Sequence, residues 1–459
     1  MLPYEANVLT FEKRSTDRCL GVRISILASP VNRTLTTARA LRGTVSVPAD
    51  KSIAHRALLI SALAVGDSEI EGFAADAADP QSTLGCLKAL GIRFTPSSLN
   101  LTVHGSGLHG LRQPTRSLDA GNSGTTIRLL AGVLAGQTFV STIGGDESLN
   151  RRPMKRIIDP LSEMGARIEA TEGQTAPLTI HGTCPLRAVE YRLPVASAQV
   201  KSAVLFAGLF SDGMTKVIER TPTRDHTERM LGLKVIESPP GKVIEVQGGM
   251  AIQPGRFIIP GDISAAAFLI AAALIVPGSE LRLAGIGLNP TRSRILDVFR
   301  SLGGDIQITD QRVVGSEPVG DLVVRGSSLR GSLDLRGDLV AELIDEIPIL
   351  AVTAAFSDGS FAVEDASELR LKESDRIHAL ATNLRKLGLD VEEYEDGFAF
   401  QAKKGLTGSE FESYGDHRIA MAFGIAGIGV PNGALIRNSE CVDISFPGFW
   451  EKLQSVQGT

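Results

Sequence analysis

Hydrophobic and polar positions along this chain follow a pattern that recurs six times. Each copy opens on polar residues, runs through an apolar stretch to a glycine, and ends in a short segment rich in β-branched residues, such as TFVSTI or SFAVED. The copies open near Lys51, Asn122, Ser197, Asp262, Asp345 and Asp416. Self-similarity at a period of roughly 65–85 residues predicts repeated supersecondary units.

A second kind of segment within these units has apolar residues at three- and four-residue spacing, which predicts amphipathic helices. The clearest are PQSTLGCLKALGIRFT, MKRIIDPLSEMGARIEA, TRSRILDVFRSLGGDIQI and ESDRIHALATNLRKLGLDVEE. Each ends in a Leu-Gly or Met-Gly pair followed by alternating residues, so we expect left-handed caps at Gly91, Gly165, Gly303 and Gly388. Short helices that alternate with strands predict an α/β (or α+β) protein.

The two most similar openers, VPADKS and IPGDIS, divide the chain into halves of three units each. We therefore expect two similar lobes, over residues 51–261 and 262–459. Residues 1–38 lie outside the repeat and are basic, so we expect a flexible extension or leader. A transit peptide is the alternative, against which Glu5 and Glu12 argue.

Composition narrows the class of protein. A net charge of −5 and a content of 5% aromatic residues do not indicate a nucleic-acid-binding protein. The cysteines lie far apart without a CxxC pair, which favours a reduced, cytoplasmic protein; they are Cys19, Cys86, Cys184 and Cys441. The longest apolar run, residues 263–276, is too short to span a bilayer, so we expect neither a nucleic acid nor a membrane as partner.

Cations gather at the openers and at helix starts rather than on one solvated face. They are Lys51, Arg56, Arg128, Arg152, Arg224, Lys372, Arg376 and Arg418. Helix N-termini present unpaired N–H groups and the positive end of the dipole, and guanidinium groups grip carboxylates and phosphates. A substrate with several anionic groups would fit this set. Ordinary helix capping and unrelated salt bridges are the alternative interpretation.

Two carboxylates stand among these cations. Asp345 begins an apolar helix, and Glu373 lies between Lys372 and Arg376. A carboxylate held near cations can act as a base. The alternatives are a plain helix N-terminal acid and a surface ion pair. The histidines show no HxxxH spacing, and no nucleophile elbow or phosphate-binding Walker loop is present, so we expect no metal site.

Eight motifs taken together resemble the family of 3-phosphoshikimate 1-carboxyvinyltransferases (EPSP synthases), in the family's order over roughly residues 40–450. They are DKSIAHRALLISALA, DAGNSGTTIRLLAG, GGDESLNRRPM, VASAQVKSAVLFAGL, TRDHTERML, IDEIPILAV, ELRLKESDRI and DHRIAMAF. Their details resemble the bacterial branch more than the plastid form.

The resemblance implies two lobes, each of three βαβαββ repeats, that close on a hinge, with residues 39–50 joining the second lobe. It implies transfer of the enolpyruvyl group of phosphoenolpyruvate to the 5-hydroxyl of shikimate 3-phosphate, with release of phosphate. No metal or organic cofactor is implied, and we expect a monomer.

The resemblance also implies roles for individual residues. Asp345 would deprotonate the attacking hydroxyl, and Glu373 with Lys51 would handle the proton added to the enol methylene. Shikimate 3-phosphate would be held by Lys51, Ser52, Arg56, Ser197, Ala198, Gln199, Arg224, Asp345 and Lys372. Phosphoenolpyruvate would be held by Lys51, Gly124, Arg152, Gln199, Arg376 and Arg418. Arg128 matches a family arginine beside the site.

One position departs from the family pattern: Ile444 and Ser445 stand where some members have a phosphoenolpyruvate-binding lysine. The sister transferase that acts on UDP-N-acetylglucosamine carries a reactive cysteine in a Gly-Gly-Cys loop. Here that loop reads Gly144-Gly145-Asp146, which argues against the sister activity. A repeat scaffold that binds phosphorylated ligands without catalysis would not need Asp345 and Glu373 among the cations.

Overall fold

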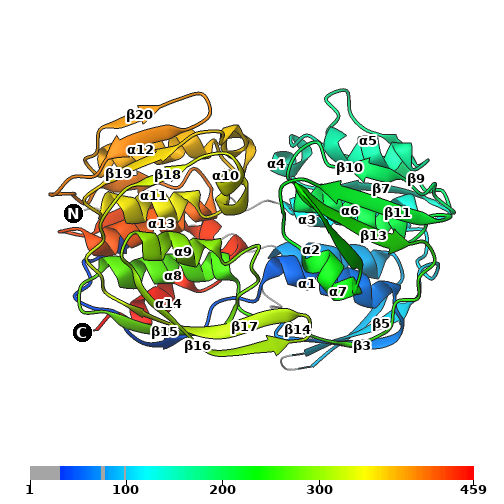
Figure 1. Ribbon diagram of the computed structural model, residues 1–459, viewed down its shortest axis with the longest axis horizontal. Coiled ribbons are helices and arrows are strands. Elements are labelled where there is room, and N and C mark those ends of the chain that lie inside the picture. The colour runs from blue at the N-terminus through cyan, green and yellow to red at the C-terminus, as the bar shows by residue number, and fades with distance from the viewer. Residues whose placement is uncertain (1–30, 74–77, 98–99, 459) are drawn as a thin grey trace, which may run out of the picture.

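The computed structural model describes residues 31–73, 78–97 and 100–458, which form two lobes side by side (Figure 1). In the described residues the strands build six small sheets, three in each lobe. Five of them share one plan, in which a first strand pairs in parallel with a second and the remaining two join antiparallel. The expected α/β fold of βαβαββ repeats in two lobes is therefore confirmed.

The first lobe contains three of these sheets. Its first unit holds α1 (Lys51–Leu63), β3 (Val65–Glu71), α2 (Ala78–Ala89), β4 (Arg93–Pro96), β5 (Asn100–Ser106) and β14 (Arg256–Ile258). The second holds β6 (Leu118–Asp119), α3 (Gly124–Ala135), β7 (Val140–Gly144), α4 (Glu147–Asn150), α5 (Lys155–Glu163), β8 (Arg167–Glu169) and β9 (Leu178–His181). The third holds β10 (Glu190–Arg192), α6 (Ala198–Gly208), β11 (Met214–Glu219), α7 (His226–Leu231), β12 (Lys234–Ser238) and β13 (Gly241–Gln247).

The second lobe repeats this arrangement. One unit holds β2 (Arg42–Val45), α8 (Ile263–Ile275), β15 (Glu280–Gly287), α9 (Arg294–Ser301), β16 (Asp305–Val314) and β17 (Glu317–Arg325). The next holds β18 (Leu333–Leu335), α10 (Asp338–Leu343), α11 (Ile347–Ala355), β19 (Ser360–Val363), the 3-10 helix η1 (Ser367–Leu371), α12 (Arg376–Lys386), β20 (Val391–Glu393) and β21 (Phe398–Gln401). The last holds β22 (Glu410–Glu412), α13 (His417–Gly429), β23 (Ala434–Arg437), η2 (Ser439–Ile444), α14 (Phe449–Ser455) and β1 (Arg33–Leu35).

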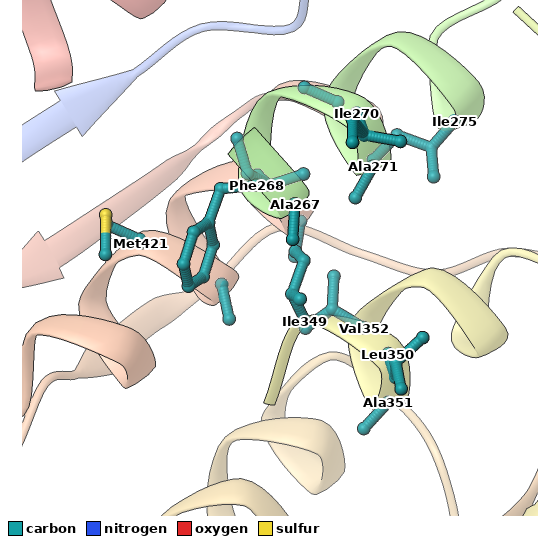
Figure 2. Packing of buried hydrophobic residues seen from close by; sticks show 14 of the residues in the cluster. Ala267, Phe268, Ile270, Ala271, Ile275, Ile349, Leu350, Ala351, Val352 and Met421 are labelled. Atoms are coloured by element: carbon teal, nitrogen blue, oxygen red, sulfur yellow. The ribbon is translucent and has the colours of Figure 1, made fainter. Parts of the chain in front are cut away.

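The opening helices of the units form the centre of each lobe. Every residue of α8 is buried, because the segment ISAAAFLIAAALI offers no polar face to water beyond its first turn. Figure 2 shows Ala267 and Phe268 of this helix packed near Ile349 of α11 and Met421 of α13. A separate core in the first lobe is built in the same way around α1, α3 and α6. Each lobe therefore has its own hydrophobic core.

The lobes exchange their first strands. Strand β2 precedes α1 of the first lobe but pairs in parallel with β15 of the second. Strand β14 precedes α8 of the second lobe but pairs in parallel with β3 of the first. The chain therefore passes between the lobes twice.

The predicted helix ends match the structure. The glycines expected as caps follow α2, α5, α9 and α12 and have φ angles of +94°, +103°, +82° and +108°; they are Gly91, Gly165, Gly303 and Gly388. Only glycine adopts this backbone conformation without strain.

Most of the expected extension, residues 1–30, lies outside the described residues. Part of the remainder, Arg33–Leu35, is strand β1, which pairs antiparallel with β23. Within the described ranges, helices that combine the length and apolar character needed to cross a bilayer are absent.

Candidate active site

A cavity of about 240 Å³ lies between the lobes and is lined by residues of both. The first lobe contributes the starts of α1, α3 and α6 and the loop before α7. The second contributes the turn before α11, the end of η1 and the start of α13. Of the residues predicted from the sequence, those that line it are Lys51, Ser52, Gly124, Arg152, Ser197, Ala198, Gln199, Arg224, Asp345, Lys372, Glu373 and Arg418. Arg128, expected beside the site, lines it as well.

Capped helix starts form much of this wall. The Asp50 carboxylate accepts from Ser52 N at 2.8 Å to cap α1, and Ser123 Oγ accepts from Thr126 N at 3.1 Å to cap α3. Ser197 caps α6, and Asp416 caps α13. The first backbone amides of these helices remain at the cavity, where their dipoles favour an anion.

One corner of the cavity combines a helix start with two guanidinium groups. A Cβ atom placed on Gly124 would lie 2.8 Å from Arg128 Nη1 and 3.5 Å from Arg152 Nη1. Arg128 Nη1 donates to Gln199 Oε1 at 2.7 Å, and Arg152 Nη2 donates to Asn122 Oδ1 at 2.6 Å. Burial, together with the nearby cations, lowers the pKa of Arg128 to about 10, so it still carries its charge at neutral pH. An anion bound here would relieve the repulsion between the two cations.

Asp345 lies at the centre of a group of cations. Its Oδ2 is 2.5 Å from Arg224 Nη2 and 3.7 Å from Arg418 Nη2, and its Oδ1 is 3.7 Å from Arg376 Nη1. Burial alone would raise the pKa of this carboxyl, but Arg418, Arg224 and Lys372 hold it well below its usual range. The carboxylate is therefore ionised and able to accept a proton.

Glu373 is the second ionised carboxylate of the cavity. Its Oε2 is 2.6 Å from Arg376 Nη2, and Arg376 Nε donates to Asp416 Oδ2 at 2.8 Å. Burial opposes its charge, but Arg376 and Arg152 lower the pKa of Glu373 below its usual range. Neighbouring Lys372 is also buried, and this burial lowers its pKa. An ammonium with a lowered pKa gives up its proton more readily.

Lys51 and His417 show features that the sequence did not indicate. Lys51 Nζ is 3.0 Å from Asp79 Oδ2, a residue of α2 that also lines the cavity. Lys51 lowers the pKa of Asp79 in spite of its burial. Among the described residues, neither ring nitrogen of His417 has a hydrogen-bond partner, and burial lowers its pKa to about 4. This imidazole is neutral at physiological pH.

Two predicted substrate ligands lie behind the cavity wall instead of on it. Arg56 is 2% exposed, and its guanidinium donates to Ser52 O, Thr227 Oγ1 and Ser202 Oγ. It therefore fixes the start of α1 in this structure. Arg376 is 1% exposed, and its Nη1 has no hydrogen-bond partner within the described part of the chain.

Several lining residues were missed by the sequence analysis: Asp79, Arg156, Thr291, Glu342 and Glu368. Arg156 and Glu368 form an ion pair of 3.0 Å between the lobes. Nothing in the local sequence separates Arg156 from the other polar positions of its helix. Ile444, at the position that departs from the family pattern, also lines the cavity and adds no charge to it.

Histidine, cysteine and acidic side chains of the described residues are spread over the fold. Groups of His, Cys, Asp or Glu arranged to hold a metal ion are absent from them. The cysteines that the structure describes, Cys86, Cys184 and Cys441, do not line the cavity.

Comparison with known proteins links this chain to one family. Residues 35–453 match the family described as EPSP synthase (3-phosphoshikimate 1-carboxyvinyltransferase). The chain is 52% identical to the 3-phosphoshikimate 1-carboxyvinyltransferase of Salinibacter ruber, covering 92% of this chain and 99% of the relative. It is 46% identical to that of Brevibacillus brevis, covering 91% and 98%. The EPSP synthase structure from Acinetobacter baumannii superposes with a TM-score of 0.83 at 39% identity, covering 94% and 98%.

Proposed function

The chain belongs to the EPSP synthase family, and from this premise we propose that the cavity between its lobes transfers the enolpyruvyl group of phosphoenolpyruvate to the 5-hydroxyl of shikimate 3-phosphate, releasing phosphate. The observation that carries the proposal is the ionised carboxylate of Asp345, held among Arg224, Arg376 and Arg418 in a cavity lined by helix N-termini. Each substrate carries a phosphate and a carboxylate. A wall of cations and backbone amides suits both of them.

Shikimate 3-phosphate binds between the starts of α1 and α6 and the second lobe. Lys51, Ser52, Ser197, Ala198 and Gln199 supply donors from the first lobe, and Asp345 with Lys372 approaches from the second. Arg224 takes the phosphate, which weakens its ion pair with Asp345. Arg56 acts on this ligand by holding Ser52, because it is buried and each of its three nitrogens donates to a protein oxygen.

Phosphoenolpyruvate binds at the corner formed by Gly124, Arg128 and Arg152. The missing side chain at Gly124 lets both guanidinium groups come close to the start of α3, where one anion can contact all three. Gln199 and Lys51 lie on the side of the acceptor substrate, and Arg418 closes the site from the second lobe. Arg376 supports Glu373 from behind, and its buried Nη1 lies 3.7 Å from Asp345 Oδ1 without a hydrogen-bond partner among the described residues.

The chemistry proceeds by addition and elimination. Asp345 takes the proton of the 5-hydroxyl while the oxygen attacks C2 of phosphoenolpyruvate, and the ammonium of Lys51 gives a proton to the methylene carbon. This yields a tetrahedral ketal that carries a methyl group. Glu373, which is ionised, then takes a proton from that methyl group as the C–O bond to phosphate breaks.

A phosphate-release assay with two acceptors tests the proposal. Shikimate 3-phosphate should support turnover in the presence of phosphoenolpyruvate, and UDP-N-acetylglucosamine should not. Turnover only with the nucleotide sugar would assign the sister activity. If no phosphate is released with either acceptor although shikimate 3-phosphate and phosphoenolpyruvate both bind tightly, the protein would be a binding scaffold.

The remaining assignments belong to the same proposal. We place the lobe boundaries at residues 51–261 and 262–459, with residues 39–50 in the second lobe. A monomer that acts in the cytoplasm belongs to the same proposal. Light scattering of the purified protein tests the oligomeric state.

A further inference from the structure

The two passages between the lobes lie against each other. Asp50 N donates to Pro260 O, and Asp262 N donates to Pro48 O, each at 2.8 Å. A Cβ atom on Gly261 would lie 2.8 Å from Val47 Cγ2, so this close approach depends on the absence of a side chain there. The passages therefore form one paired segment, which we call the crossing, made of residues 47–50 and 259–262.

Arg292, in the loop between β15 and α9, binds both passages of the crossing. Its Nη1 is 3.2 Å from Asp50 Oδ2, and its Nη2 is 3.1 Å from Asp262 Oδ1. Nη2 also donates to Ser264 Oγ at 2.6 Å. Asp50 is the N-cap of α1, and Asp262 is the N-cap of α8. One guanidinium group thus joins the caps of the first helix of each lobe.

Arg292 is connected to residues of the proposed mechanism on both sides, through Asp50 and through Ser264. Asp50 is followed directly by Lys51, the first residue of α1. Ser264, which accepts from Arg292, also contacts the buried carboxylate of Glu346, the residue after Asp345. A displacement of Asp50 would therefore move Lys51, the next residue, and a displacement of Ser264 would reach Asp345 through Glu346.

We propose that Arg292 is a positioning residue for the reaction, which fixes the two passages of the crossing and so sets Lys51 against Asp345. This role rests on the proposed function, and it is served by the geometry of the guanidinium fork rather than by its charge alone. A lysine at this position would reach one cap at a time, because its ammonium is a single point.

The environment of Arg292 explains why its removal would be costly and why a conservative change is the better probe. The side chain is 4% exposed and faces three buried acids, Asp50, Asp262 and Glu346. Burial disfavours its charge, but Asp50 and Asp262 raise its pKa. A neutral replacement would leave these acids without their cation, which is strongly destabilising in a buried site.

The test compares Arg292→Lys with Arg325→Lys. Arg325 is a partly exposed arginine on β17 of the same lobe, and its Nε pairs at 2.7 Å with the exposed Glu280, at the end of β15 opposite to the one that meets the crossing. We expect Arg292→Lys to lower kcat about 10- to 100-fold, because small misplacements of reacting groups are costly, and to raise KM for shikimate 3-phosphate. Arg325→Lys should leave both constants within about two-fold, as exposed pairs contribute little. Wild-type turnover in the same assay tests the proposed function separately.

A second variant keeps the test decisive if Arg292→Lys folds poorly. Asp50→Asn retains a good N-cap residue for α1 but removes one charged partner of Arg292. If the two residues act through one contact, the double variant should lose little more kcat than the worse single variant. Unchanged kcat in folded Arg292→Lys or in Asp50→Asn would overturn the proposal, as would losses that multiply fully in the double variant. A fall in melting temperature with kcat intact would show a structural role only.

Discussion

Arg224 of the first lobe and Asp345 of the second form an ion pair of 2.5 Å across the cavity. The pair links the loop before α7 to the turn before α11, 121 positions further along the chain. A substrate phosphate that binds Arg224 competes with this carboxylate. Binding of the substrate phosphate to Arg224 is thereby coupled to the release of Asp345, the proposed base, from its ion pair with Arg224.

Asp345→Asn should lower kcat by about 10²–10⁴, the usual contribution of a positioned general base. KM for both substrates should change far less, because the amide keeps the shape of the carboxylate. Steady-state kinetics of phosphate release measures both constants. Asp338→Asn is the matched control, since Asp338 accepts from Thr221 Oγ1 across the lobes at 2.8 Å without lining the cavity. Near wild-type turnover of Asp345→Asn would refute the assignment of the base.

Shikimate 3-phosphate should draw the lobes together. Its proposed ligands come from both lobes, with Lys51 and Gln199 on one side and Asp345 and Lys372 on the other. A ligand that binds only the closed arrangement shifts the population toward it. Small-angle scattering with and without this ligand should show a smaller radius of gyration when it is present. An unchanged radius at saturation would count against closure driven by this substrate.

Gly124→Ala should weaken inhibition by glyphosate far more than it weakens binding of phosphoenolpyruvate. Glyphosate resembles phosphoenolpyruvate in charge but is slightly longer, and the added methyl would lie 2.8 Å from Arg128 Nη1. Arg128 must then move, and its bond to Gln199 moves with it. The inhibition constant of glyphosate, compared with KM for phosphoenolpyruvate, measures the effect. If the wild type already ignores millimolar glyphosate, Gly124 does not decide sensitivity in this chain.

Acidification from pH 6.5 to pH 4 should lower the free energy of unfolding. Burial lowers the pKa of His417 from 6.5 to about 4, and that of His55 likewise. In this window the unfolded chain binds more protons than the folded one, so stability falls as pH falls. Each histidine contributes up to about 3 kcal/mol at the acid end of the window.

Denaturant unfolding at several pH values measures this slope. His417→Gln should make it shallower, because one of the two groups is removed. His109→Gln is the control, since His109 is exposed and should leave the slope as it is. An equal slope in wild type and His417→Gln would contradict a buried, neutral His417.

Local features of the fold could be predicted because they depend on short stretches of chain. The openers become N-caps through hydrogen bonds that span two or three residues, as at Asp50, Ser123 and Asp416. The cap glycines follow from the backbone conformation that ends a helix. Twelve predicted site residues line the cavity, and some of them, such as Lys51, Gly124 and Ser197, stand at the helix starts that open the repeats.

Contacts between distant parts of the chain could not be predicted, and they define how the site works. Lys51 pairs with Asp79 from the neighbouring helix α2, and Arg292 pairs with Asp50 over 242 positions. Arg56 has the pattern of a substrate ligand, yet it lies buried behind the wall, where it donates to Ser202 and Thr227.

The repeat pattern, its helix caps and the set of charged groups are properties of the sequence, since each depends on spacing and residue type along a short segment. The pairing of those charges depends on the exchange of β2 and β14 between the lobes and on the paired crossing that results. Periodicity records which residues face a core, but it carries no information about which lobe a strand joins. The partner of each buried charge therefore follows from the folded arrangement of the whole chain.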